Sequence, residues 1–259
     1  MILSADYHTH TIYSHGKKDI IDNAISAKNK GLLELGISDH GFAHPAFGLR
    51  KRKLDEMRVK IEKAKEETGV NVLLGIESNI IGTDGTTDLN HALYDKFDIF
   101  LAGIHKFVMY KFGTYFSLFL PNFFNSTFKC KNIPKSLIER NTKTYINVVK
   151  NNPVDVITHP NFCCFADAYE VAKVCADYGT YFELNAKKDH LTDDEIEKIL
   201  KTDVRFVIGS DGHSPERVGE ISRVENLIKR TNFPLERIDN IDGRLPKFRF
   251  KSFKESAGR

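Results

Sequence analysis

Seven short apolar segments alternate along the chain with longer amphipathic stretches, and this alternation restricts the fold more than any other feature. The segments are residues 2–7, 33–38, 70–76, 99–104, 154–158, 180–184 and 205–208. Several are β-branched or are followed by a turn signal, which is typical of buried parallel strands. Strands alternating with helices predict an α/β fold with right-handed crossovers. Either a closed barrel or an open doubly wound sheet fits, and no dinucleotide-binding or P-loop glycine pattern follows the first strand.

Between these segments the sequence predicts helices, several of which stop at a glycine suited to a helix C-terminus. They span residues 19–30, 54–68, 135–150, 167–178, 192–201 and 215–229. Thr192 should cap the fifth helix and Ser214 the sixth. The chain has 259 residues, 41% of them apolar, which is enough for one core. We expect a single domain over residues 1–259, with an aromatic-rich insertion at 107–132 and a less regular tail at 233–259.

Side chains that bind metal ions follow almost every predicted strand. They are His8, His10, Asp39, His40, Glu77, His105, His159, Asp211 and His213, with Asn185 after the sixth strand. In parallel α/β sheets and barrels, catalytic groups collect at the carboxyl ends of the strands. Six separate segments therefore direct a ligand-type side chain to one face. A lone histidine is usually structural, but seven of the ten histidines lie in or beside these segments.

The residue types suit a cluster of two or three divalent metal ions. Neutral imidazole binds zinc, manganese or iron, and a carboxylate adds negative charge and can bridge two ions. His8 and His10 are two residues apart in an extended segment, so both can reach one ion. His15 lies in a turn just beyond them, and Glu77 is the candidate bridging ligand.

Three other side chains are candidates for contact with an anionic substrate, namely Lys106, Arg217 and His44. Lys106 and Arg217 each follow a ligand motif, although such residues are more often solvated surface charges. His44 lies shortly after the second predicted strand. We expect His91 and His190, which do not follow a strand, to be surface or helix-capping groups.

Six short motifs occur in a fixed order along the chain. They are D-Y-H-T-H-T-x-x-S-H-G at 6–16, I-S-D-H-G at 37–41, G-I-E at 75–77, G-I-H at 103–105, T-H-P at 158–160 and G-S-D-G-H-S at 209–214. This ordered set resembles the motifs of the PHP superfamily, named for polymerase and histidinol phosphatase. The resemblance implies a distorted (β/α)7 barrel, TIM-like in carrying its metal site at the C-terminal ends of the strands.

The resemblance also implies a trinuclear site with a specific set of ligands. By position, the first ion would be held by His8, His10, Glu77 and Asp211, the second by Glu77, His105 and His159, and the third by His15, His40 and His213. Catalysis would depend above all on Glu77 and Asp211. The histidine at position 15 makes the chain more similar to the stand-alone phosphatase branch of the family.

These features predict hydrolysis of a phosphate ester by a water activated at the metal site. We favour a phosphomonoesterase acting on a small metabolite, a class that includes histidinol phosphate. Two alternatives stay open: a phosphodiesterase or exonuclease acting on nucleotides or oligonucleotides, and a non-catalytic metal-binding regulatory module. The net charge of only +3 counts mildly against nucleic acid. A metal-bound water, Asp39 or His44 would protonate the leaving group.

The sequence also bears on the cellular setting. Met1 runs almost directly into the first predicted strand without a visible signal peptide, so we expect a cytoplasmic protein. The cysteines contain no C-x-x-C pair and are expected to be free thiols: Cys130, Cys163, Cys164 and Cys175. The aromatic stretch 107–124 is interrupted by lysine, glycine and proline and is not expected to span a membrane. It should form a lid over the site, local core or a subunit interface.

Overall fold

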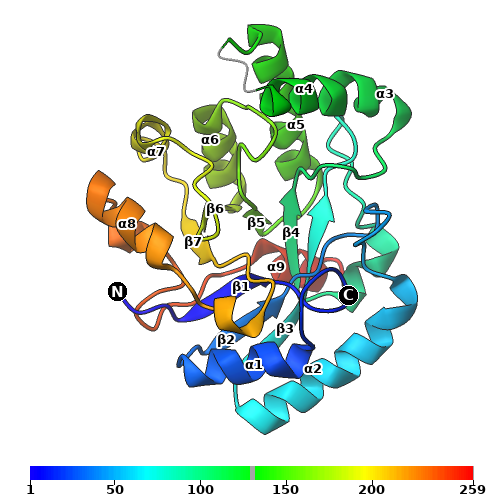
Figure 1. Ribbon diagram of the computed structural model, residues 1–259, viewed down its shortest axis with the longest axis vertical. Helices are drawn as coiled ribbons and strands as arrows, with labels where there is room; N and C mark the ends of the chain where they lie inside the picture. Colours follow the sequence, from blue (N-terminus) through cyan, green and yellow to red (C-terminus); the bar gives the residue numbers. More distant parts are fainter. Residues whose placement is uncertain (129–131, 259) are drawn as a thin grey trace.

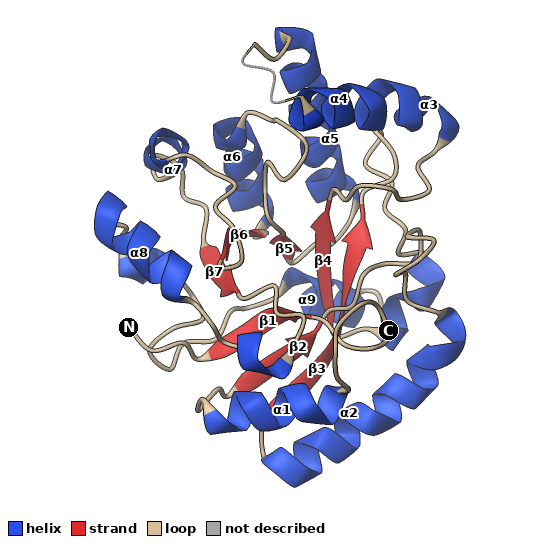
Figure 2. Cartoon of the chain, in the orientation of Figure 1, coloured by secondary structure: helices blue, strands red, loops and turns tan. Residues whose placement is uncertain are grey.

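The structure is a computed structural model that describes residues 1–128 and 132–258. Its centre is a sheet of seven parallel strands in the order β1 to β7 (Figures 1 and 2). The strands are β1 (Ala5–Thr9), β2 (Glu34–Ile37), β3 (Asn71–Asn79), β4 (Ile99–Gly103), β5 (Val156–Ile157), β6 (Tyr181–Asn185) and β7 (Phe206–Gly209). Thr9 also pairs with Gly212 just beyond β7, so the sheet curves into a nearly closed barrel. The predicted α/β barrel is confirmed.

Helices connect the strands and cover the outside of the barrel (Figure 1). They are α1 (Ile20–Asn29), α2 (Leu54–Thr68), α5 (Lys135–Asn151), α6 (Ala168–Tyr178), α7 (Asp193–Ile199) and α8 (Ser222–Thr231). Thr192 and Glu195 form a reciprocal capping box at the start of α7, as the sequence predicts. Gly69 and Gly179 end α2 and α6 in the left-handed conformation, which a glycine adopts without a steric penalty.

One predicted helix is wrong. Residues 215–229 form a short 3₁₀ turn, Pro215–Arg217, and only then the helix α8, which begins at Ser222. Gly219 breaks the run with a φ of 67°, and its amide donates a 2.8 Å hydrogen bond to the buried carboxylate of Asp6. Ser214 makes no capping hydrogen bond through its side chain. A contact with the first strand therefore overrides the local helix signal.

The inside of the barrel below the metal-binding end is filled by apolar side chains from alternate strand positions. They are Ala5, Tyr7, Ile99, Leu101, Val156, Tyr181 and Val207, with Leu73 and Phe248 packed against them. Because successive side chains of a strand point to opposite faces, residues two further along face the same interior. On β3 and β6 these positions bring Glu77 and Glu183 into the barrel.

The C-terminal tail is more ordered than the sequence suggests. It contains α9 (Arg249–Ser256), whose Phe250 is fully buried against Tyr94 and Phe100. The amide of Phe250 donates a 2.8 Å hydrogen bond to Asp155 at the start of β5. The tail thereby contributes to the core at the end of the strands away from the ligand motifs.

The aromatic insertion is helical over most of its described length. It contains α3 (Phe112–Thr114), a π-helical turn over Tyr115–Phe119, and α4 (Leu120–Thr127). Figure 1 shows these helices at one end of the molecule, beside α5. Residues 129–131 of the predicted insertion, including Cys130, lie outside the described residues. No helix in the described part has the length and hydropathy needed to cross a membrane.

The remaining cysteines, Cys163, Cys164 and Cys175, are free thiols, as predicted. Burial raises the pKa of the Cys175 thiol well above its usual value.

We expect the stability of the protein to depend on the ionisation of Asp155. Burial raises its pKa to about 7, although hydrogen bonds from the amides of Phe100 and Phe250 oppose this shift. Because the folded-state pKa exceeds the unfolded value of about 3.9, this contribution to stability is fully present below about pH 4 and is lost as the pH rises through about 7. Its slope can reach about 1.4 kcal/mol per pH unit.

Urea unfolding of the wild type and Asp155→Asn between about pH 5 and about pH 7 tests this expectation. The free energy of unfolding of the wild type should fall more steeply with rising pH than that of the variant. Equal slopes would contradict it.

Candidate metal centre

The first strand brings two histidines to the interior through a local irregularity. Ala5 and Tyr7 point into the barrel, so a regular strand would direct His8 outward. The pairing of β1 with β2 shifts register between Asp6 and Thr9. His8 and His10 are both completely or almost completely buried and face the other ligand candidates. The irregularity thus changes the direction of the side chains at the point where the ligand motif begins.

Glu77 lies at the centre of the cluster. The sequence places it at the end of a strand, but β3 continues to Asn79, so Glu77 projects from within the strand. Its side chain is fully buried, and five imidazoles surround it. The nitrogen–oxygen distances are 2.7 Å for His159, 2.8 Å for His40, 3.1 Å for His105, 3.2 Å for His8 and 3.7 Å for His10. Glu77 can therefore contact more than one cation.

Two of the predicted ligands have unusual backbone conformations. His159 has a φ of 28° and Asp211 a φ of 49°, in the region that residues with a Cβ seldom adopt. Such strain costs on the order of 1–3 kcal/mol per residue and tends to occur at functional sites. The conformation turns His159 toward Glu77 and Asp211 toward His10, whose Nε2 is 3.5 Å from the Asp211 carboxylate.

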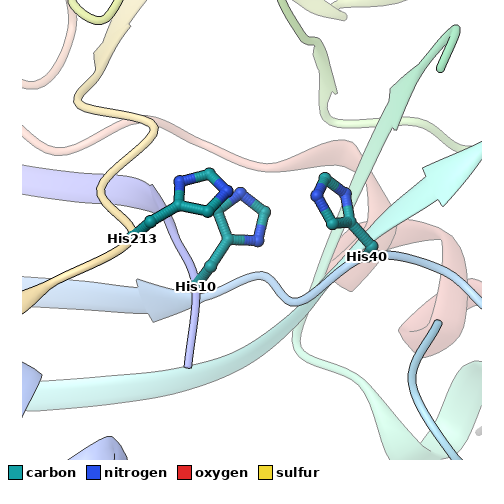
Figure 3. Close-up of side chains that lie close together, drawn as sticks. All are labelled: His10, His40 and His213. Atoms are coloured by element: carbon teal, nitrogen blue, oxygen red, sulfur yellow. The ribbon is translucent and has the colours of Figure 1, made fainter. Parts of the chain in front are cut away.

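The ligand candidates form four overlapping groups whose donor atoms lie within 4.8 Å of one another. The groups are His8–His10–Asp211, His8–Glu77–His159, His40–Glu77–His105 and His10–His40–His213. Figure 3 shows the last of these, with three rings from separate segments converging. His15 is outside these groups, although its ring centre lies 4.1 Å from that of His213 and 4.8 Å from that of His40.

The donor atoms of this cluster fit a set of divalent cations. Several are buried without a well-formed hydrogen bond to any described residue: both ring nitrogens of His10 and His105, Nε2 of His8 and His213, Nδ1 of His40 and His159, and Oε2 of Glu77. Unpaired buried polar atoms are rare, and each costs about 1–3 kcal/mol. Imidazole nitrogens and carboxylate oxygens are ligands of zinc, manganese and iron. Such cations would satisfy these atoms together.

The ionisation of the cluster also suits cations. Burial lowers the pKa of His40 to about 3 and of His15 to about 4, and it holds that of His10 well below the usual value. These imidazoles are neutral near pH 7 and keep a lone pair for a metal ion. Burial by itself raises the pKa of Glu77, but His105 and His8 hold it well below its ordinary value. Glu77 is therefore ionised.

Glu183 is a functional residue that the sequence reasoning missed. Its Oε1 lies 2.6 Å from Nδ1 of His8, and its Oε2 accepts a 2.6 Å hydrogen bond from the amide of His159. With its proton on Nδ1, His8 directs Nε2 toward Glu77, an arrangement typical of metal-binding histidines. A signal was available, because Glu183 is two residues before Asn185 and shares its face of the strand.

Three aspartates, two of them buried and Asp88 half-buried, hold the loops that carry the site. Asp39 accepts hydrogen bonds of 2.7 Å and 2.6 Å from the amide and hydroxyl of Thr11, and Asp88 accepts one of 2.7 Å from the amide of Ala43. Asp6 accepts hydrogen bonds from the backbone amides of Ser210 and Gly219. The Asp39 carboxylate is thus fully engaged in fixing the loop after β1, which argues against its predicted part as a proton donor.

A cavity of about 600 Å³ opens onto the cluster. Of the predicted substrate contacts, Lys106 and His44 line it, whereas Arg217 is not among the described residues that do. His190 also lines it, with its ring centre 5.9 Å from that of His159, so its expected place as a surface or capping group is wrong. Burial, His159 and Lys188 lower the pKa of His190 to about 3.

Three more cationic side chains reach the cavity without having been predicted. They are Lys187, Lys188 and Arg223, and the aromatic rings of Phe47, Phe107 and Phe162 complete its walls. The Nζ of Lys187 is 3.0 Å from the Asp211 carboxylate and 3.3 Å from Nδ1 of His213. Lys187 and Lys188 closely follow Asn185, but none of the six motifs lies beside them or beside Arg223.

Comparison with known proteins identifies the family. The model of the PHP domain matches residues 6–190 of the chain. The chain belongs to the PHP family. The match ends before Asp211 and His213, which the barrel nevertheless brings to the same site as His8 and His10.

Proteins described as probable phosphatases are similar over almost the whole chain. One, described as a probable phosphatase of Caldanaerobacter subterraneus subsp. tengcongensis, is 32% identical over 92% of this chain and 87% of its own length. Another probable phosphatase, from Thermoanaerobacter sp. strain X514, is 30% identical over 96% of this chain and 95% of its own. Together with the metal-binding cluster, these matches identify a metal-dependent phosphoesterase.

A solved PHP structure shows the same fold. Histidinol phosphate phosphatase from Lactococcus lactis, in complex with zinc, L-histidinol and phosphate, aligns with a TM-score of 0.59. The two chains are 14% identical, and the alignment covers 90% of this chain and 95% of the other. At 14% identity, this similarity shows only that the two proteins share a fold.

We expect alanine at Glu77 or at Asp211 to abolish metal loading and phosphatase activity together. Each carboxylate supplies negative charge that would offset the charge of the cations, whereas the neutral imidazoles supply none. Elemental analysis and a phosphatase assay on the same preparation would measure both. Glu197→Ala, an exposed position on α7, is the control and should retain both. Near-wild-type turnover in either cluster variant would contradict the assignment.

Glu183→Gln should weaken metal binding by about 10- to 100-fold, because an uncharged amide has only one acceptor oxygen and cannot accept hydrogen bonds from both the His8 ring and the backbone amide of His159. Competition with a chromogenic chelator would measure the affinity, with Glu197→Gln as the matched control. An affinity equal to that of the wild type would show that Glu183 does not orient His8.

Proposed function

We propose that the protein hydrolyses phosphate monoesters of a small metabolite with three divalent cations, zinc, manganese or iron, at the cluster. The observation that carries this proposal is the convergence of eight ligand candidates from separate segments in one cluster, with a cavity of about 600 Å³ that opens onto it and that His15 also lines. A cavity of this size suits a small molecule. The probable phosphatases that match over nearly the whole chain support a monoesterase.

We assign the ligands as the family resemblance implies. His8, His10, Glu77 and Asp211 would hold the first cation, Glu77, His105 and His159 the second, and His15, His40 and His213 the third. The grouping of His8, His10 and Asp211 agrees with the first set. Bound cations would supply Lewis acidity, which lowers the pKa of water and neutralises charge on phosphoryl oxygens.

The side chains around the cluster would bind and orient the ester. The ammonium group of Lys187 lies at the edge of the cluster, next to Asp211, and has N–H groups to donate to phosphoryl oxygens. Lys106 lines the cavity next to the ligand His105. Phe47 and Phe162 would exclude water from the organic part of the substrate.

His44 would donate a hydrogen bond to the leaving group. Its Nδ1 accepts a 3.0 Å hydrogen bond from the amide of Phe47, which assigns the proton of the neutral ring to Nε2. Burial and His105 lower the pKa of His44, so the ring is neutral at pH 7. A neutral ring can polarise the leaving oxygen through Nε2–H without itself carrying a charge.

A second candidate function is cleavage of nucleotides or oligonucleotide ends. Aromatic rings and cationic side chains both line the cavity, a combination that binds single-stranded nucleic acids in other proteins. The proteins that match over most of the chain are described as phosphatases, which favours the monoester.

Assays with 4-nitrophenyl phosphate, bis(4-nitrophenyl) phosphate and a short oligonucleotide, each with zinc or manganese, would separate the two functions. We expect the monoester to be cleaved at least about 10-fold faster than the diester, a difference of about 1.4 kcal/mol in activation free energy. Glu77→Gln, prepared in parallel, controls for a contaminating phosphatase. Faster cleavage of the diester or oligonucleotide would replace the proposed function by the second one.

A further inference from the structure

The cavity carries more positive charge than one phosphate group at the cluster would use. Four cationic side chains line it, Lys106, Lys187, Lys188 and Arg223, whereas the only carboxylate among its described lining residues is the ligand candidate Asp211. Lys187 is next to that carboxylate. Lys106, Lys188 and Arg223 remain, and the described lining residues of the cavity include no further carboxylate that would neutralise them.

Arg223 is only weakly neutralised by its own surroundings. It projects from α8 with its side chain 49% exposed, and its Nη1 lies 3.9 Å from Oδ2 of Asp189. That same oxygen accepts a 3.3 Å hydrogen bond from Arg230. One carboxylate is thus shared between two guanidinium groups, which leaves Arg223 able to bind an anion through its parallel N–H groups.

Lys188 is held beside the cluster by the loop that follows β6. The side-chain oxygen of Asn185 accepts hydrogen bonds of 3.0 Å and 3.1 Å from the amides of Lys187 and Lys188. The side-chain nitrogen of Asn185, Nδ2, is 3.4 Å from Oδ2 of Asp211. The side chain of Asn185 therefore fixes the backbone of both lysines beside the ligand candidate Asp211, and Lys188 makes no ion pair with a described carboxylate.

We propose that the substrate carries a second anionic group, a carboxylate or a second phosphate, which Lys188 and Arg223 bind while the ester phosphate lies at the cluster. This inference rests on the proposed phosphomonoesterase function. The organic body between the two anionic groups would lie against Phe47, Phe107 and Phe162. The same cations disfavour a substrate that carries a free ammonium group, because like charges repel in a partly buried cavity.

Aryl phosphates that differ only in one substituent test the proposal directly. The series is 4-methylphenyl phosphate, 4-carboxyphenyl phosphate, 1,4-phenylene bisphosphate and 4-(aminomethyl)phenyl phosphate. We expect kcat/KM for at least one of the doubly anionic compounds to exceed that of the methyl compound by about 10-fold, which corresponds to about 1.4 kcal/mol. The aminomethyl compound should be the poorest substrate. Comparison of the carboxylate with the bisphosphate shows which anion the cations select.

Variants locate the preference. In the Lys188→Ala/Arg223→Ala double variant, the ratio of kcat/KM between the preferred anionic compound and the methyl compound should fall to about 1. Arg223→Glu should favour the aminomethyl compound instead. Lys229→Ala removes one positive charge from the exposed surface of the same helix and should keep the wild-type ratio. An unchanged ratio in the double variant, or the same loss in the control, would overturn the proposal.

Binding of phosphonates separates this inference from the proposed function. Calorimetry with 4-carboxybenzylphosphonate and 4-methylbenzylphosphonate needs no turnover and no leaving group, so a difference in Kd reflects the substituent. We expect the carboxylate to bind about 10-fold more tightly to the metal-loaded wild type than the methyl compound. Absence of turnover with all four phosphates would contradict the phosphomonoesterase. Turnover of all four with equal kcat/KM, together with equal Kd values for the two phosphonates, would contradict only the second anionic group.

Discussion

The carboxylate of Glu77, buried among five imidazoles, is the interaction on which the rest of the structure depends. Burial alone would keep this group protonated, because a charge without a partner is costly inside a protein. Only neighbours that converge from several strand ends make the ionised form stable. The barrel supplies that convergence, since parallel strands deliver their carboxyl ends to one rim. The metal cluster and the fold are therefore two consequences of the same geometry.

Departures from regular strand geometry occur where the ligands lie. The register shift in β1 turns His8 inward, and the positive φ values of His159 and Asp211 turn their side chains toward Glu77 and His10. Each departure costs free energy, which the surrounding contacts must offset. Gly209 shows how tightly this rim is packed, because a Cβ there would lie 2.2 Å from the Glu183 carboxylate. The site leaves little room for other ligand arrangements.

Neighbours decide what a carboxylate does in this protein. Asp39 and Asp88 accept hydrogen bonds from backbone amides and hold loops, whereas Glu77 and Asp211 face imidazoles and suit cations. Sequence motifs do not make this distinction, and Asp39 in particular is adjacent to the ligand candidate His40. The same holds at the cavity, where Arg223 shares the carboxylate of Asp189 with Arg230 and is therefore only weakly neutralised.

The sequence by itself determined the seven strands, the α/β class and the set of ligand candidates, whereas it left a closed barrel and an open sheet equally possible until the motifs were compared with those of the PHP superfamily. These follow from hydrophobic alternation and from the residue types after each strand, both of which are local properties of the chain. Only the tertiary structure decided that Glu183 orients His8, that His190 and Arg223 reach the cavity, and that residues 215–229 do not form one helix. The physical reason is distance along the chain: His8 and Glu183 are 175 residues apart, and Asp6 and Gly219 are 213 apart. Contacts of this kind exist only once the barrel has closed.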